Sequence, residues 1–124
     1  VYALGRLLGL DTRLIISLLP KSVTTPIGVA LSESLGGLTA VTSLAIVLTG
    51  IVGAVFLPSV LRLFGTKHPV VTGIAIGTAS HAVGTSRAIE LGEVEGAMSG
   101  LAIGIAGLIT AVIISVAAAV LGLG

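Results

Sequence analysis

Two long stretches without charge dominate the pattern of apolar and polar positions along the chain. One lies between Glu33 and Arg62, and the other runs from Glu95 to the end of the sequence. A helix that crosses a bilayer needs about 20 predominantly apolar residues. The pattern therefore predicts two membrane-spanning helices, over residues 38–61 and 96–124, in an all-α polytopic membrane protein.

Each predicted span is preceded by a shorter apolar segment that polar residues interrupt. Residues 20–26 read Pro-Lys-Ser-Val-Thr-Thr-Pro, and residues 77–87 read Gly-Thr-Ala-Ser-His-Ala-Val-Gly-Thr-Ser-Arg. Proline removes a backbone donor and glycine weakens a helix, so both segments are predicted to be discontinuous. The structural breaks are assigned to Pro20, Pro26, Gly77 and Gly84. Broken backbone at membrane depth needs protein or enclosed water to satisfy it, which predicts a polar site.

The sequence leaves open whether each interrupted segment crosses the membrane or enters and returns as a hairpin. Loop charge favours crossing, because crossing separates basic from acidic loops, and the basic side is expected to be cytoplasmic. The loops separated in this way contain Arg6, Arg62 and Lys67 on one face and Glu33, Glu93 and Glu95 on the other. The two interrupted segments are expected to cross or face each other near the bilayer midplane.

The same order of features occurs twice, which predicts an internal repeat. A shift of 57 positions places Glu33 on Glu90 and Gly50 on Gly107, and residues 22–26 on residues 79–83. The repeat units are about 13–62 and 70–119, each with an interrupted segment, an acidic turn and a long helix. Crossing segments would make the repeats parallel, and hairpins would make them inverted. Paired discontinuous segments in two halves indicate a transport site.

Composition agrees with lipid as the surrounding solvent. Of 124 residues, 55% are hydrophobic and 9% are charged, whereas soluble domains carry about a quarter charged residues. The net charge of +1 gives no electrostatic basis for binding nucleic acid. Cysteine is absent, which excludes disulfides and thiolate chemistry. No cofactor or metal is expected, since the two histidines have no further ligand at metal-binding spacing.

Glycine spacing in the second predicted span indicates close helix packing. Gly96, Gly100 and Gly104 recur every four residues, and Gly107 extends the same face. Small residues at this spacing let helix backbones approach each other in lipid.

Two cations in or beside the interruptions are candidates for binding a small carboxylate. The guanidinium of Arg87 is well shaped for a carboxylate, but Glu90, three residues later, offers a helix-surface ion pair instead. Lys21 has the same two alternatives, since its long stem can carry the ammonium group to the membrane surface.

The other candidates are His81 and the hydroxyl residues of both interruptions. His81 would act as a proton carrier or be satisfied by backbone groups, and the hydroxyls would bond a carboxylate or broken-helix carbonyls. The predicted substrate-binding residues are Lys21, Ser22, Thr24, Thr25, Thr78, Ser80, His81, Thr85 and Arg87. Half-helix N-termini near Pro26 and Thr85 would also attract an anion. Enzyme activity is not expected, because adjacent Ser80 and His81 form no triad.

Four groups of residues follow one another in a specific order from about Gly9 onward. They are residues 19–26, Glu33 with Gly36-Gly37, Leu48-Thr49-Gly50, and residues 77–87. Together they resemble the LrgB/CidB family. The resemblance implies a multi-pass protein of the bacterial cytoplasmic membrane that is antiholin-like, influences murein hydrolase activity and autolysis, and works beside a holin-like LrgA/CidA partner. The plastid glycolate/glycerate translocator is similar to a fusion of the two, and other bacterial pairs are associated with pyruvate uptake.

These observations predict a transport module for small monocarboxylates such as pyruvate, glycolate or glycerate. Its expected partners are the lipid bilayer, the carboxylate, the holin-like protein and further copies of itself. Since family members are longer, residues 1–124 are expected to form one LrgB-like domain from the C-terminal part of the protein. The alternative is a non-transporting antiholin-like regulator that acts through helix contacts on the Gly96, Gly100 and Gly104 face.

Overall fold

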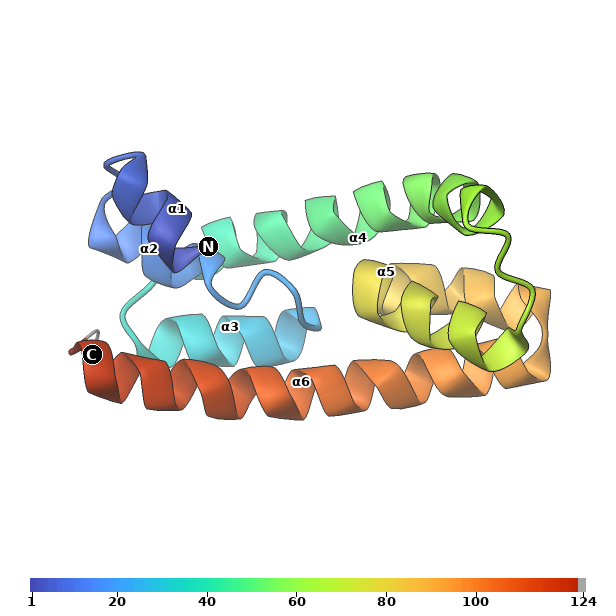
Figure 1. Ribbon diagram of the computed structural model, residues 1–124. Helices are drawn as coiled ribbons and strands as arrows, with labels where there is room; N and C mark the ends of the chain where they lie inside the picture. Colours follow the sequence, from blue (N-terminus) through green and yellow to red (C-terminus); the bar gives the residue numbers. More distant parts are fainter. Residues whose placement is uncertain (123–124) are drawn as a thin grey trace. The chain divides into compact units, whose positions relative to one another are not determined.

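The computed structural model describes residues 1–122, whose regular secondary structure consists of helices without strands (Figure 1). The helices are α1 (Tyr2–Leu7), α2 (Thr12–Leu18), α3 (Thr25–Ser34), α4 (Thr39–Leu63), α5 (Pro69–Leu91) and α6 (Glu93–Leu121). The all-α class predicted from the sequence is confirmed.

Among the described residues, α4 and α6 are the two helices long and apolar enough to cross a membrane. They have 25 and 29 residues, and at a rise of 1.5 Å per residue even the shorter exceeds the roughly 30 Å of a bilayer's hydrocarbon core. α4 continues through Pro58 and ends at Leu63, two residues after the predicted end of the span. α6 begins earlier than predicted, because Glu93 and Glu95 occupy its first turn, where carboxylates stabilise a helix N-terminus.

The chain divides into two compact units. Unit 1 comprises Val1–Val47 and the end of the chain from Gly107, and unit 2 comprises Leu48–Ala106. α4 and α6 each contribute one part to unit 1 and another part to unit 2. Each unit contains one of the two interrupted segments.

In unit 1, α2 and α3 are the antiparallel arms of a hairpin, here called hairpin 1 (Figure 1). Arg13 Nε donates to the Gly36 carbonyl at 3.1 Å. Further along the arms, a Cβ added to Gly28 would lie 3.2 Å from the Pro20 carbonyl oxygen. The first contact joins residues 23 positions apart and the second joins residues 8 positions apart. The two arms therefore meet at a non-helical tip, residues 19–24. Of the two residues assigned to the first break, Pro20 lies in this tip and Pro26 lies in the first turn of α3.

A threonine of α4 holds the two arms of hairpin 1 together. Thr42 Oγ1 lies 2.8 Å from the Ser17 carbonyl oxygen and 2.7 Å from Ser32 Oγ. Ser17 Oγ in turn accepts a hydrogen bond from the Leu38 amide at 2.7 Å. Thr42, Ser17 and Ser32 have no exposed surface. Because leaving a buried polar group unpaired costs about 1–3 kcal/mol, these bonds offset the cost of reversing the chain in apolar surroundings.

In unit 2, α5 changes direction at His81, whose backbone has φ 49° and ψ −140°. The first half of α5 runs parallel to α6, because Gly73 lies against Glu95 and Gly77 lies against Ser99. Both glycines are close-packing positions, since a Cβ at either would meet the α6 backbone.

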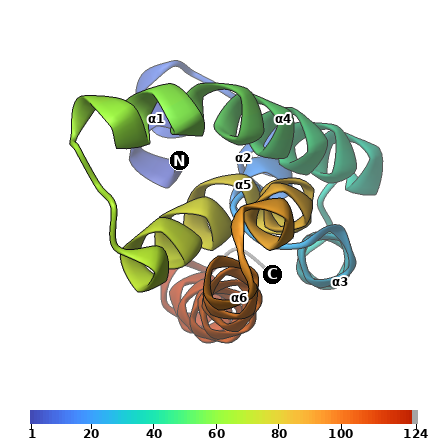
Figure 2. The same ribbon diagram turned by 90° about the vertical axis from the view of Figure 1, so that its right-hand side faces the viewer.

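The second half of α5 runs antiparallel to α6. Thr85 Oγ1 lies 2.8 Å from Ser99 Oγ, whereas Ile89, further along α5, contacts Gly96, which precedes Ser99 in α6. In Figures 1 and 2 the two halves of α5 lie side by side. α5 is therefore a second hairpin, here called hairpin 2, whose tip is at His81.

These hairpins bear on two expectations from the sequence. The path of the chain favours the hairpin alternative over the crossing alternative, because each interrupted segment returns towards the end at which it begins. Six basic residues in the whole chain give too weak a charge bias to decide the path. The second break falls at His81 and not at Gly77 or Gly84, which are helical and serve close packing.

We expect Thr42→Val to destabilise the full-length protein by about 1–3 kcal/mol, because it leaves the buried Ser17 carbonyl and Ser32 hydroxyl without this partner. Thr78→Val is the matched control, since the exposed Thr78 hydroxyl bonds only to carbonyls of its own helix. The unfolding midpoint in detergent measures both. Equal midpoints for the two variants would contradict the role given to Thr42.

Candidate functional site

The tip of hairpin 2 gathers three of the predicted substrate-binding residues. Ser80 is fully buried, and His81 is 5% exposed. Thr85 Oγ1 donates to the His81 carbonyl at 2.9 Å, and so ties the second half of α5 to the reversal. Gly84 makes room at the tip, because a Cβ there would lie 3.0 Å from Ser80 Oγ. Ser80, His81 and Thr85 thus lie together.

Ser80 is the unusual side chain of this tip. Among residues 1–122 its buried hydroxyl has no hydrogen-bond partner, which costs about 1–3 kcal/mol. The second half of α5 begins beside it, at residues 82–84, where the first N–H groups of a helix lack intrahelical acceptors. A buried donor next to a helix N-terminus is the arrangement that an anion completes.

His81 adds backbone strain to the same tip. It is the one non-glycine residue with positive φ in the described chain. Such conformations cost on the order of 1–3 kcal/mol for a side chain with a Cβ and cluster at binding sites and switches. The sequence placed the polar segment correctly but gave no sign that the reversal occurs at this single residue.

The tip of hairpin 1 carries the other predicted cation and three predicted hydroxyls. Lys21 Nζ donates to Ser22 Oγ at 3.1 Å, in an exposed position. Thr24 is the N-cap of α3, but its side chain makes no capping hydrogen bond. Thr25 begins α3 and is exposed. The half-helix predicted to open near Pro26 is therefore present, with Pro26 in its first turn.

Two predicted residues lie away from the tips. Arg87 forms an ion pair with Glu90, and the two side chains are 64% and 61% exposed. This is the helix-surface alternative left open by the sequence. Thr78 is exposed and bonds the carbonyls of Ile74 and Ala75 in its own helix. Both side chains therefore bond to residues three or four positions away in their own helix.

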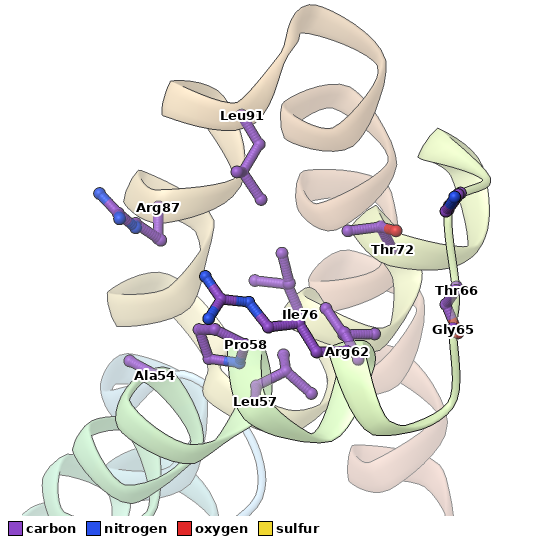
Figure 3. Close-up of a pocket in the computed structure, with 12 residues that line it drawn as sticks. Ala54, Leu57, Pro58, Arg62, Gly65, Thr66, Thr72, Ile76, Arg87 and Leu91 are labelled. Carbon is purple, nitrogen blue, oxygen red and sulfur yellow. The ribbon is translucent and has the colours of Figure 1, made fainter.

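Unit 2 also contains a cavity of about 420 Å³ that the sequence did not assign (Figure 3). Its lining combines three cations, Arg62, Lys67 and Arg87, with apolar side chains of α4 and α5. The Arg62 guanidinium extends into the cavity, and the Arg87 guanidinium points away from it (Figure 3). The short basic loop after the first span was the available sequence signal.

The glycine face of α6 has two packed and two open positions. Gly96 packs against Ile89, and a Cβ on Gly107 would lie 2.8 Å from Ile27 Cδ1. Nothing in the described chain lies within 4 Å of a Cβ added to Gly100 or Gly104. The open pair therefore faces no other described residue of the chain.

The fold and the tips define an all-helical protein whose polar groups gather where apolar helices reverse. Its described residues contain no group of three or more His, Asp or Glu side chains that could hold a metal ion. The chain belongs to the LrgB-like family, whose sequence model matches residues 1–120. Membership of this family, with two helices long enough to span, makes it a membrane protein.

Similar proteins include the antiholin-like protein LrgB of Bacillus mycoides (strain KBAB4) and that of Bacillus cereus (strain B4264). Each is 42% identical over 118 residues, which cover 92% of this chain and 50% of the relative. The chain therefore spans about half the length of these curated relatives. No solved structure matches it.

Replacing Ser80 by Ala in the full-length protein should leave the unfolding midpoint unchanged or raise it, because the variant removes a buried hydroxyl without a partner. Ser99→Ala is the matched control at an equally buried serine. It should lower the midpoint, because Ser99 Oγ bonds Thr85 Oγ1. Thermal unfolding in detergent compares them. If Ser80→Ala destabilises as much as Ser99→Ala, the Ser80 hydroxyl has a structural partner.

Proposed function

We propose that the chain forms part of a membrane transport module for small monocarboxylates of the pyruvate, glycolate or glycerate type. The observation that carries the proposal is the buried Ser80 hydroxyl without a partner among residues 1–122, beside the N-terminus of the second half of α5. A carboxylate would accept hydrogen bonds from this hydroxyl and from the amides of this helix N-terminus.

The hairpins support the proposal through their polar groups. In the proposal both are membrane-embedded discontinuous segments, and their tips carry the chemistry that hydrocarbon cannot satisfy. Because α4 would cross the bilayer once between them, the two hairpins would enter from opposite faces and form inverted repeats. Transporters commonly place substrate sites at such half-helix ends, with helix N-termini directed at anionic groups.

Each tip would contribute differently to binding. At the tip of hairpin 2, Ser80 and the amides of residues 82–84 would hold the carboxylate, and His81 would respond to protonation. At the tip of hairpin 1, Lys21 would supply positive charge, with the hydroxyls of Ser22, Thr24 and Thr25 as further donors. Arg87, which Glu90 neutralises, is not needed in this group.

A second candidate function is regulation of a holin-like partner without transport, with the family-implied effect on murein hydrolases and autolysis. Two observations favour it. The similar proteins are named antiholin-like, and Gly100 and Gly104 present an open small-residue surface on α6. Helix backbones approach closely at such surfaces in lipid. Both functions would suit one protein, because altered metabolite flux would itself change lysis.

Uptake of labelled carboxylate into vesicles tests the transport proposal, with the full-length protein and its holin-like partner reconstituted together. Ser80→Ala should raise KM about 10-fold or more, since a hydrogen bond to a charged group contributes about 1.5–3 kcal/mol. Ser34→Ala is the control, because the exposed Ser34 hydroxyl only bonds the Leu31 carbonyl. No uptake above empty vesicles by the wild type would refute transport, and an unchanged KM for Ser80→Ala would refute the site.

Co-purification of the holin-like partner tests the regulatory candidate. Leucine at Gly100 or Gly104 should abolish co-purification, because each side chain would fill the open surface. Val116→Leu is the control, at an exposed position of the same helix. Full recovery of the partner with both glycine variants would remove this surface from the interaction.

A further inference from the structure

The cavity of unit 2 has two different kinds of wall, which together restrict its ligand. Arg62 and Lys67 line it with positive charge. Leu57, Ile76 and Leu91 line it with hydrocarbon (Figure 3). A free inorganic anion would be bound by the first kind of wall alone. The apolar wall is complementary to a ligand that also carries hydrocarbon.

The positive charge in this cavity is not neutralised by the protein. Among residues 1–122, neither Arg62 nor Lys67 makes an ion pair, and the carboxylate of Glu90 is engaged by Arg87. The Arg62 side chain nevertheless extends into the cavity and not towards solvent (Figure 3). A phosphate or phosphodiester accepts hydrogen bonds from a guanidinium in a bidentate geometry and would supply the missing charge.

The position of the cavity along the chain indicates where such a ligand comes from. Arg62 ends the apolar stretch of α4, so in a membrane it lies at the level of the lipid headgroups. Leu63 and Phe64, which follow directly, are 83% and 77% exposed. Apolar side chains left bare between two cations suit the boundary between acyl chains and headgroups.

We propose that this cavity binds the headgroup of an anionic phospholipid, with Arg62 and Lys67 on the phosphate and the apolar wall against the glycerol and upper acyl chain. Basic pockets between membrane helices bind such headgroups by the same combination of charge and hydrocarbon. The volume of about 420 Å³ holds a headgroup and not a whole lipid, so the acyl chains extend along the exposed helices. This binding is independent of carboxylate transport.

Lipid binding to the full-length protein in detergent tests this proposal, with phosphatidylglycerol as the probe and phosphatidylcholine as the neutral comparison. Native mass spectrometry gives the affinity for each lipid. Phosphatidylglycerol should bind more tightly, and Arg62→Gln and Lys67→Gln should each weaken it about fivefold, which is the effect of one basic residue near an anionic headgroup. Arg6→Gln, an exposed cation of α1 outside the cavity, should leave the affinity unchanged.

Three results would overturn the proposal. Equal affinity for the two lipids would show that charge does not select the ligand. An equal loss with Arg6→Gln would show attraction to the protein's general charge. Displacement of phosphatidylglycerol by millimolar inorganic phosphate would show that the site takes a free anion and that its apolar wall contributes nothing.

Discussion

The need to satisfy backbone carbonyls and amides wherever the chain reverses among apolar side chains governs this structure. In hairpin 1 the hydroxyl of Thr42 reaches both arms, through the Ser17 carbonyl and the Ser32 hydroxyl. In hairpin 2 the hydroxyl of Thr85 donates a hydrogen bond to the His81 carbonyl and is also hydrogen-bonded to the Ser99 hydroxyl of α6. The bonding hydroxyl thus comes from α4 in hairpin 1 and from the hairpin's own Thr85 in hairpin 2, where Ser99 of α6 is its partner. Apolar surroundings offer no alternative partner, so these bonds are a condition of the fold.

This arrangement supports the proposed repeat more strongly than sequence identities do. The shift of 57 positions that places Glu33 on Glu90 also places Thr42 on Ser99, which holds the corresponding position against hairpin 2. The bounds of the two compact units fit the same shift. Moving residues 1–47 of unit 1 forward by 57 positions gives residues 58–104, and moving its second segment back by 57 gives positions from residue 50 onward. Together these positions nearly match unit 2, Leu48–Ala106.

The sequence predicted the long helices and the places where helices break, because both depend on local composition. Charge-free stretches marked α4 and α6 to within a few residues, and Pro20 marked the first tip. The direction of the chain after a break depends on distant contacts, such as those of Ser99, and proline or glycine does not encode it. Arg87 was predictable as the partner of Glu90 from spacing alone. The sequence analysis missed Thr42 and Ser99 as hydrogen-bonding partners of the hairpins, although a shift of 57 positions places one on the other.

Labelling of single cysteines with a membrane-impermeant thiol reagent tests most directly whether both interrupted segments are re-entrant. This chain contains no cysteine, so Asp11→Cys, Glu33→Cys, His68→Cys and Glu93→Cys report the exposed ends of the two hairpins in an otherwise cysteine-free full-length protein. If both segments are re-entrant, positions 11 and 33 are labelled from one side of the membrane and positions 68 and 93 from the other. Labelling of 11 and 33 from opposite sides, or of 68 and 93 from opposite sides, would contradict the re-entrant path.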